Sequence, residues 1–366
     1  MNIDLCMVMT PTFTDIERLR YSCQLNLPGF GEKGQLALKK ASVLIIGAGG
    51  LGCPAALYLA SAGIGRIGIV DFDAVSMSNL HRQVLYAPED AGKKKALVAA
   101  AYLSRQNPHI QITPIVQKAS PDNIMGLVES YDLTLDCTDN FEARYLINDA
   151  CVLAGKPLVY GAIYQYEGQV SIWNAPNADG SRSPHYRDLF PSVNAAMVPN
   201  CAEGGVLPAL AGIIGCIQAN EAIKFLAGTG ETLSGKILLF DALSMQSRII
   251  RTGDKSRVVV SELPAGEDIP FVLAADFKKN GDMAARYRLI DVRKPEERAV
   301  FHIGGEHVPI DILEERAADL TQSKQPLLFY CASGKRSAEA VRIIRRHASN
   351  AEAWSLDGGL KAWQEA

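Results

Sequence analysis

Apolar and polar positions follow two alternating periods along the first 160 residues. Short β-branched runs typical of buried strands are separated by longer segments whose apolar residues recur at helical spacing. The strand-like runs are 43–46, 66–70, 111–116, 133–135 and 157–160, and the helix-like segments are 51–62, 93–105 and 141–154. Strands that alternate with helices predict a parallel sheet with helices on its faces.

The pattern changes after Gly161. Residues 167–173 alternate like a half-exposed antiparallel strand, and the Pro-, Asn- and Ser-rich residues 174–199 predict a long loop over a functional face. We expect an apolar helix at 205–227 and a further strand at 236–240. These elements predict an α/β domain of Rossmann-like type, with a mixed, mainly parallel sheet.

A second α/β pattern begins after an interruption between residues 251 and 270, where charges, prolines and Gly266 indicate a linker. Strands are expected at 288–291, 326–330 and 353–356, and a helix at 337–347. We therefore expect a first domain at 1–250, a linker at 251–270 and a small α/β domain at 271–366, as suits a chain of 366 residues.

Composition excludes several classes of protein. With 48% hydrophobic and 21% charged residues the chain is typical of a folded protein, and a net charge of −3 offers no basic excess for nucleic acid or an anionic membrane. Residues 41–65 carry no charge over a length that could span a bilayer, but their central glycines and Pro54 favour a strand, a turn and a helix. We expect neither nucleic acid nor a membrane as partner.

The eight cysteines are scattered, and the closest two are 14 residues apart. No CxxC pair exists for a zinc ribbon or a redox site. The N-terminal residues lack the basic start and apolar run of a signal peptide. Reduced cysteines in a chain with a full core predict a cytoplasmic protein.

A glycine-rich turn, Gly47-Ala-Gly-Gly-Leu-Gly52, joins the first strand to the first helix of the sheet. Such glycines let backbone N–H groups approach a phosphate at the positive end of a helix. Asp71 ends the next strand, 24 residues after Gly47, where a carboxylate typically binds a ribose hydroxyl. The pair predicts a nucleotide site, with NAD as the default ligand and a purely structural turn as the alternative.

Residues farther along favour a triphosphate over a dinucleotide. An adenylate-forming site needs cations for the phosphates and a carboxylate for Mg²⁺. Arg82 and Lys95 could supply the cations, and Asp139, at the carboxyl end of a strand, the carboxylate. Each also has a structural interpretation: a surface ion pair for Arg82, a solvated side chain for Lys95 and a helix N-cap for Asp139.

These motifs, in this order, resemble the MoeB/ThiF family, the bacterial relatives of ubiquitin-activating enzymes. The resemblance runs from Arg20-Tyr21-Ser22 through GAGGLG, DFD, SNLHRQ, GKKK and DCTDN to residues 235–241. It implies that ATP·Mg²⁺ is used to adenylate the C-terminal glycine carboxylate of a small ubiquitin-like sulfur carrier, with release of pyrophosphate. The adenylate would become a thiocarboxylate for molybdopterin, thiamine or tRNA thiolation, and the enzyme would be a homodimer.

The resemblance also implies roles for particular residues, which line the nucleotide, the phosphates and the metal. They are Gly50 in the turn, Asp71 on the ribose, Ser78, Asn79, Leu80, His81 and Arg82 along the nucleotide and phosphates, Lys95 on phosphate charge, and Asp139 with Asn140 at the metal end. Alignment and charge neutralisation dominate such catalysis, because the attacking carboxylate is already ionised at pH 7. Cys201 lies where the family often has a cysteine for thioester or persulfide formation, although a small apolar residue closing the loop fits equally well.

Two positions depart from the family pattern. Cys23 replaces an arginine that usually reaches a neighbouring subunit's triphosphate, so that another cation substitutes or ATP binding is weakened. Residues 185–188, His-Tyr-Arg-Asp, occupy the place of the first zinc-binding CxxC, and no second pair follows Phe240. We predict no zinc, which leaves the anchoring of this loop to be explained.

Cys331 begins a short loop between an apolar strand and a helix. Backbone N–H groups, the helix dipole, Lys335 and Arg336 would favour a thiolate, which can carry a persulfide; a buried strand-end cysteine is the alternative. The segment resembles a rhodanese domain, whose motifs appear in order at 289–296, 302–305 and 357–363. The resemblance makes Cys331 the active cysteine and Asp291 a fold-stabilising residue.

The leading hypothesis is ATP-dependent activation and sulfuration of a carrier ending in Gly-Gly, with sulfur from a persulfide donor. A dinucleotide-dependent oxidoreductase fused to a sulfurtransferase is one alternative. A non-catalytic scaffold that binds the carrier, motivated by Cys23, is another. The sequence names neither the carrier nor the pathway, and it leaves open whether Cys331 passes sulfur through Cys201.

Overall fold

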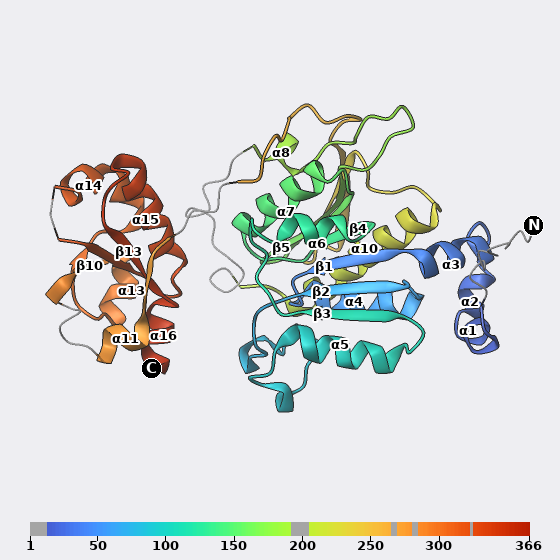
Figure 1. The fold of residues 1–366 in the computed structure, drawn as a ribbon, viewed down its shortest axis with the longest axis horizontal. Coiled ribbons are helices and arrows are strands. Elements are labelled where there is room, and N and C mark those ends of the chain that lie inside the picture. Colours follow the sequence, from blue (N-terminus) through green and yellow to red (C-terminus); the bar gives the residue numbers. More distant parts are fainter. Residues whose placement is uncertain (1–12, 192–204, 265–268, 280–284, 323–324) are drawn as a thin grey trace, which may run out of the picture. The chain divides into compact units, whose positions relative to one another are not determined.

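The computed structural model describes residues 13–191, 205–264, 269–279, 285–322 and 325–366. The chain forms two compact units, one ending at Ala265 and the other beginning at Gly266, and each is described by itself (Figure 1). This division falls inside the segment expected to be a linker. The limits expected for the linker and the two domains stay a prediction.

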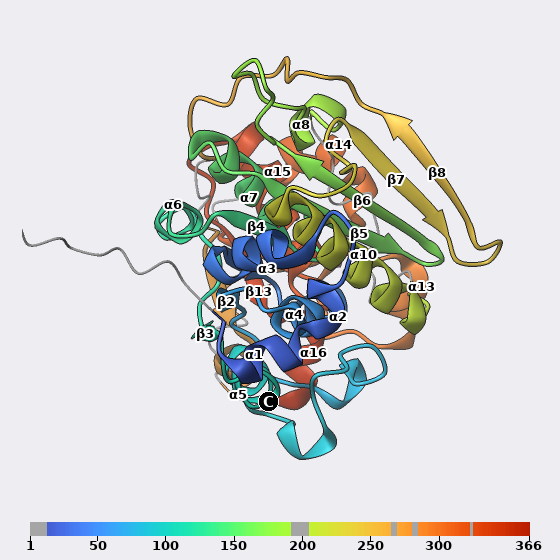
Figure 2. The same cartoon turned by 90° about the vertical axis from the view of Figure 1, so that its right-hand side faces the viewer.

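The first unit is built on an eight-stranded sheet with the order β3-β2-β1-β4-β5-β6-β7-β8. Strands β1 to β5 are parallel, and β6 to β8 continue the sheet in antiparallel fashion, with β7 and β8 forming a ribbon at its edge (Figure 2). The strands are β1 Ser42–Ile46, β2 Arg66–Val70, β3 Gln111–Ile115, β4 Leu133–Asp136, β5 Leu158–Tyr164, β6 Glu167–Trp173, β7 Lys236–Asp241 and β8 Gln246–Arg251.

Helices cover both faces of this sheet, as the apolar runs of its strands require. In β1, Val43 and Ile45 belong to one core cluster and Leu44 and Ile46 to another on the opposite face. The helices of the unit are α1 Asp15–Arg20, α2 Ser22–Leu25, α3 Gly31–Lys40, α4 Gly52–Ala62, α5 Lys95–Gln106, α6 Ile124–Glu129, α7 Phe141–Leu153, α8 Tyr186–Leu189 and α10 Pro208–Ala227. Short 3₁₀ turns, η1 Met77–Asn79 and η2 Pro88–Asp90, precede α5.

The order of the strands creates a natural place for a ligand. β1 pairs with β2 on one side and with β4 on the other, so the chain connections diverge at the carboxyl end of β1. Ligands of open α/β sheets bind at such a switch point. The glycine turn follows β1 directly, which puts it at this point.

One helix in the described part of the chain, α10, has the length and apolar composition of a membrane span. It packs against α3, α4, β5 and β6 within the first unit. Leu210 and Ile214 are fully buried there, as in the core helix of a globular domain.

The second unit holds a five-stranded parallel sheet with the order β11-β10-β12-β13-β9. Cores lie on both faces: Ile290 and Phe329 belong to one, Leu328 and Tyr330 to the other. Its elements are β9 Phe271–Leu273, α11 Ala274–Lys279, β10 Arg288–Asp291, α13 Pro295–Val300, β11 Glu306–His307, η4 Ile310–Ile312, α14 Leu313–Leu320, β12 Leu327–Tyr330, α15 Lys335–His347, β13 Ala353–Asp357 and α16 Gly359–Glu365.

The predicted fold class is confirmed: a Rossmann-like domain with a mixed, mainly parallel sheet is followed by a small α/β domain. Several elements were not expected from the sequence, among them β8, β9 and β11. All six residues of β8 are exposed and β11 has only two residues, so neither shows the apolar period that identifies a strand. α8 lies in the segment predicted as a long loop.

Candidate nucleotide and sulfur-transfer sites

The glycine turn after β1 has a shape that only glycine allows at two positions. Gly47 has a φ of +97°, and a Cβ there would lie 2.7 Å from the carbonyl oxygen of Cys137. A Cβ on Gly52 would lie 1.9 Å from the carbonyl oxygen of Gly47. The N–H of Cys137 also donates to the carbonyl of Ile46, at 2.9 Å. The turns after β1 and β4 are therefore in contact, which brings the predicted metal-binding turn beside the glycines.

Asp71, at the end of β2, is buried against the glycine turn. Its carboxylate accepts hydrogen bonds from the N–H groups of Ala48 and Asp73, both at 2.8 Å. Burial raises the pKa of Asp71, while the charge of Lys95 and these hydrogen bonds act in the opposite direction. The sequence did not indicate Tyr86, whose hydroxyl donates to the carbonyl of Ala48 at 2.8 Å and fixes the turn from the other side.

Arg82 lies over the glycine turn. Its Cγ and Cδ are 3.4 Å from the position that a Cβ on Gly50 would take. One terminal nitrogen donates to Oδ1 of Asn79 at 3.2 Å, and the other contacts Nε2 of His81 at 2.7 Å. Arginine has donors only, so the histidine nitrogen accepts. The hydroxyl of Ser78 pairs with another serine hydroxyl at 2.9 Å.

Leu80, the remaining member of this predicted segment, packs against the core of the sheet. The segment from Ser78 to Arg82 therefore lies near the glycine turn. Arg82 is its residue that contacts the turn, at Gly50.

Lys95 is not the solvated lysine of the structural alternative. It is only 4% exposed at the start of α5, and its ammonium forms an ion pair with Asp73 at 3.0 Å. Asp73 follows β2 directly, so this cation lies at the same end of the sheet as Asp71. A bound phosphate would compete with Asp73 for Lys95.

Asp139 and Asn140 follow β4 and differ in their contacts. The Oδ1 of Asn140 accepts from the N–H of Ala143 at 2.8 Å, so Asn140 is the N-cap of α7. The cap considered for Asp139 therefore belongs to the next residue. The Asp139 side chain is exposed and makes no hydrogen bond or ion pair within the described part of the chain. An unpaired carboxylate near the turn predicted to bind phosphate fits Mg²⁺.

A buried ion pair below this turn was not anticipated from the sequence. Nε of Arg144 lies 3.5 Å from Oδ2 of Asp136, and the guanidinium lies over the rings of Tyr160 and Tyr186, 5.1 and 5.8 Å from their centres. Burial raises the pKa of Asp136 although Arg144 opposes this effect. The N–H and hydroxyl of Thr138 also donate to Asp136, which fixes the turn that carries Asp139.

Residues 185–188, in the place expected for a zinc-binding pair, are anchored by hydrogen bonds. The Asp188 carboxylate accepts from the N–H groups of Arg257 and Val258, at 2.7 and 3.1 Å, and from the Ser256 hydroxyl at 2.9 Å. Nε2 of His185 donates to the carbonyl of Val258 at 3.0 Å. We call this set of contacts the Asp188 clasp. It joins the loop to residues 256–258, part of the segment predicted as linker, and both belong to the first unit.

These residues do not fit a zinc ion. The His185 side chain is buried and both ring nitrogens are engaged, because Nδ1 accepts from the N–H of Arg187 at 3.3 Å. No cluster of three or more His, Cys, Asp or Glu side chains suited to a metal occurs among the residues that the structure describes. The absence of zinc remains a prediction that these engaged donors support.

The sequence also singled out two cysteines of the first part of the chain, Cys23 and Cys201. Cys23 is exposed on α2 and offers no charge to a nucleotide. Arg20, from the same motif, donates to the carbonyl of Gln106 at 2.8 Å. Cys201 lies outside the described residues.

The sulfur site lies at the carboxyl end of β12. Cys331 is buried, and its sulfur accepts a hydrogen bond from the N–H of Gly334 at 3.1 Å. The carbonyls of Cys331 and Ala332 accept from the N–H groups of Leu360 and Lys361, at 2.9 and 3.0 Å. These bonds from the start of α16 fix the loop. The N–H of Gly334 points to the sulfur, where it can stabilise a negative charge.

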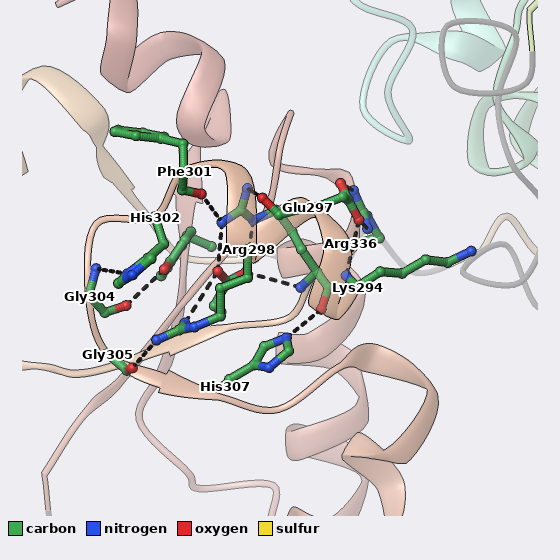
Figure 3. A network of polar contacts seen from close by, with 12 residues as sticks. Lys294, Glu297, Arg298, Phe301, His302, Gly304, Gly305, His307 and Arg336 are labelled. Atoms are coloured by element: carbon green, nitrogen blue, oxygen red, sulfur yellow. Dashed lines mark hydrogen bonds and ion pairs between the residues drawn. The ribbon is translucent and has the colours of Figure 1, made fainter.

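Figure 3 shows the polar network beside this loop, in which Arg336 faces Glu297. The guanidinium makes two hydrogen bonds to the Glu297 carboxylate, at 2.6 and 2.7 Å, and this pairing lowers the pKa of Glu297. Arg293 forms a similar pair with the buried Asp291, at 2.9 and 2.7 Å, and Arg298 lies 3.3 Å from Asp291. The sequence placed Arg336 as a cation for the sulfur, whereas the structure pairs it with a carboxylate from α13.

The chain is similar over most of its length to proteins of known name. The chain is 43% identical over 366 residues to the probable adenylyltransferase/sulfurtransferase MoeZ of Mycobacterium tuberculosis, covering 95% of this chain and 93% of that protein. It is 38% identical over 393 residues to the adenylyltransferase and sulfurtransferase MOCS3 of Sus scrofa, with 95% and 85% covered. The sulfur carrier protein adenylyltransferase of Thermus thermophilus is 48% identical over 237 residues, with 64% and 88% covered.

Among solved structures, E. coli MccB with MccA-N7isoASN has a TM-score of 0.59 at 23% identity, covering 66% of this chain and 74% of that one, which shows the likeness of the fold. The ThiF family model matches residues 21–259, and the rhodanese-like domain model matches residues 273–366. The chain therefore belongs to the ThiF family and carries a C-terminal rhodanese-like domain.

Proposed function

We propose that this enzyme adenylates the C-terminal carboxylate of a small ubiquitin-like sulfur carrier ending in Gly-Gly and then converts it to a thiocarboxylate. Membership of the ThiF family and relatives named as adenylyltransferases and sulfurtransferases support ATP-dependent activation joined to sulfur transfer. The observation that carries the proposal is that Arg82 lies over the glycine turn, Lys95 lies close to Asp71 beside that turn, and the unpaired Asp139 belongs to the turn after β4 that contacts it. Two cations there suit a triphosphate better than a dinucleotide.

In the first reaction the carrier's carboxylate oxygen attacks the α-phosphorus of ATP, and the bond to pyrophosphate breaks. The N–H groups near Gly50 would bind phosphate, Arg82 and Lys95 would neutralise charge, and Asp71 would bind the ribose. Asp139 would hold Mg²⁺, which supplies positive charge against the leaving pyrophosphate when bound. The products are an acyl adenylate and pyrophosphate.

In the second reaction the Cys331 thiolate takes the outer sulfur of a donor persulfide, and the donor leaves as a thiolate. The outer sulfur of the Cys331 persulfide then attacks the activated carbonyl, and AMP leaves. A second thiol must attack Cys331 in the resulting acyl disulfide to release the thiocarboxylate, and Cys201 is the candidate from sequence. An external thiol would reduce the remaining disulfide.

The partners and the pathway belong to the same proposal. The persulfide donor, a homodimer and a cytoplasmic location are predictions, as is the choice among molybdopterin, thiamine and tRNA thiolation. The MOCS3 and MoeZ relatives support an adenylyltransferase joined to a sulfurtransferase in one chain.

ATP–pyrophosphate exchange in the presence of candidate carriers tests the adenylation step. We expect carrier-dependent exchange in the wild type and a loss of at least about 100-fold in Asp139→Ala, because a metal-binding carboxylate is removed. Asp122→Ala, an exposed carboxylate after β3, serves as the control and should exchange normally. Exchange at background with every carrier, or an Asp139→Ala variant as active as the wild type, would refute the proposal.

A further inference from the structure

Two buried hydroxyl groups lie behind the sulfur of Cys331. Ser337, in the first turn of α15, is fully buried, and Ser355, in β13, is 4% exposed. The Ser337 oxygen lies 3.7 Å from the Cys331 sulfur and 2.8 Å from the Ser355 oxygen. The proposed steps of sulfur transfer use neither serine.

The number of hydrogens limits which acceptors these two hydroxyls can serve. Each serine has one hydrogen to donate. The Ser355 oxygen is 2.8 Å from the Ser337 oxygen and 3.5 Å from the carbonyl of Gly334, so Ser337 is its better acceptor. The Ser337 hydrogen can then go to the Gly334 carbonyl, at 2.9 Å, or to the Cys331 sulfur.

The charge on sulfur decides between these two acceptors. A thiolate is a stronger acceptor than a neutral carbonyl, because hydrogen bonds to ionised groups are roughly twice as strong as neutral ones. The Gly334 carbonyl does not lose all its partners when Ser337 turns away, since it also accepts from the N–H of Ala338 at 3.0 Å. The hydroxyl can therefore turn to the sulfur without leaving a buried carbonyl unpaired.

We propose that Ser337 is a catalytic residue of sulfur transfer, whose hydroxyl turns from the Gly334 carbonyl to the Cys331 sulfur whenever that sulfur is a thiolate. Ser355 is a positioning residue. Its hydroxyl donates to the Ser337 oxygen and so leaves the Ser337 hydrogen free for the sulfur. Cys331 is a thiolate when it attacks the donor persulfide. This inference rests on the proposed role of Cys331 and adds a third source of stabilisation to the loop N–H and the helix dipole.

The test is the pH dependence of Cys331 alkylation by iodoacetamide in the full chain, followed by peptide mass spectrometry. Exposed Cys23 provides an internal reference in every sample. We expect Ser337→Ala to shift the midpoint of the Cys331 profile upward by about 0.5 to 1 pH unit, as the loss of one long hydrogen bond of ordinary strength implies. The rate below the midpoint should fall about three- to tenfold, and the rate at high pH should stay the same.

Three further variants separate the hydroxyl from other effects. Ser337→Thr keeps a hydroxyl and should restore the midpoint, and Ser355→Ala should shift it upward by less. Ser333→Ala removes an exposed hydroxyl of the same loop that makes no hydrogen bond within the described residues, and it should shift nothing. The charged residues of the elements around the loop stay unchanged in all these variants: Asp291, Arg293, Glu297, Lys335, Arg336, Asp357 and Lys361.

A midpoint in Ser337→Ala equal to that of the wild type would overturn the proposal, because the serine would then only cap α15. Should Ser337→Ala fail to fold, an unshifted midpoint in folded Ser337→Gly, which also removes the hydroxyl, would overturn it equally. The measurement needs neither ATP nor a carrier. A shifted midpoint in a protein that never accepts sulfur would therefore refute the proposed function and leave only the hydrogen bond from Ser337 to the Cys331 thiolate in place.

Discussion

Gly359, the first residue of α16, lies tightly against the sulfur loop. It has a φ of +57°, and a Cβ there would lie 2.4 Å from the carbonyl oxygen of Cys331 and 2.7 Å from the nitrogen of Gly334. This contact lets the first N–H groups of α16 reach the loop carbonyls. The sequence shows two adjacent glycines at 358–359, but not which backbone they touch.

We expect Gly359→Ala to destabilise the second unit by about 1–3 kcal/mol and to lower thiosulfate:cyanide sulfurtransferase activity severalfold, because the loop must move away from the new methyl group. Denaturant unfolding and steady-state turnover would measure the two effects. Gly304→Ala is a matched control, with a φ of +94° but no atom within 4 Å of the new Cβ. A Gly359→Ala variant no worse than Gly304→Ala would show that the close contact is unimportant.

Single residues also show how far sequence reasoning reaches. Asp71 was predicted from its spacing to the glycine turn and Lys95 from its place in the order of motifs, and both lie near one end of the sheet because parallel strands end together. Arg336 was interpreted from its neighbours in sequence, but its partner Glu297 is 39 residues away. Such a partner depends on how β10 and β12 pair, which local sequence does not reveal.

At the scale of elements, the Asp188 clasp explains how the loop around α8 is held. The sequence shows that a cysteine pair is missing. It cannot show the replacement, because three of the partners of Asp188 are backbone N–H groups that almost every residue carries. β8 was not predicted either, because its exposed residues show no apolar period that would identify a strand.

Removing the clasp should destabilise the first unit. Burial alone raises the pKa of Asp188, but hydrogen bonds from the N–H groups of His185 and Arg257 and from the Ser256 hydroxyl lower it below its usual value. Its contribution is therefore complete above the unfolded-state pKa of about 3.9 and is lost as the pH falls through the lower folded-state value. We expect Asp188→Ala to lose about 1–3 kcal/mol in denaturant unfolding at pH 7, a difference that shrinks as the pH falls below 4.

The matched control for the clasp is Asp254→Ala, an exposed carboxylate on the neighbouring segment, which should unfold like the wild type. A zinc chelator should leave the unfolding midpoint of the wild type unchanged. A chelator that lowers this midpoint as much as Asp188→Ala does would contradict the clasp as the anchor of the loop.

At the scale of the whole molecule, the two proposed chemistries lie in separate compact units, each with its own sheet and cores. The sequence predicted this organisation because the α/β pattern stops near residue 251 and begins again. It could not predict the order of the strands within each sheet. That order depends on which strands pair, and it creates the switch point where the proposed nucleotide site lies.

Separate units predict separable losses of activity. Cys331→Ser should abolish sulfur transfer, measured with thiosulfate and cyanide, and leave ATP–pyrophosphate exchange within about twofold of the wild type, since surface changes away from a site have small effects. Asp139→Ala should do the reverse. Loss of both activities in either variant would show that the two reactions depend on one another.

The Asp188 clasp has a consequence for the chemistry that this enzyme is proposed to handle. Zinc held by thiolates presents sulfur nucleophiles that sulfane sulfur and oxidants can modify. A carboxylate bound to amide and hydroxyl groups offers no such target. The loop can therefore keep its shape in the presence of the reactive persulfides that the second unit is proposed to carry, whatever the supply of metal.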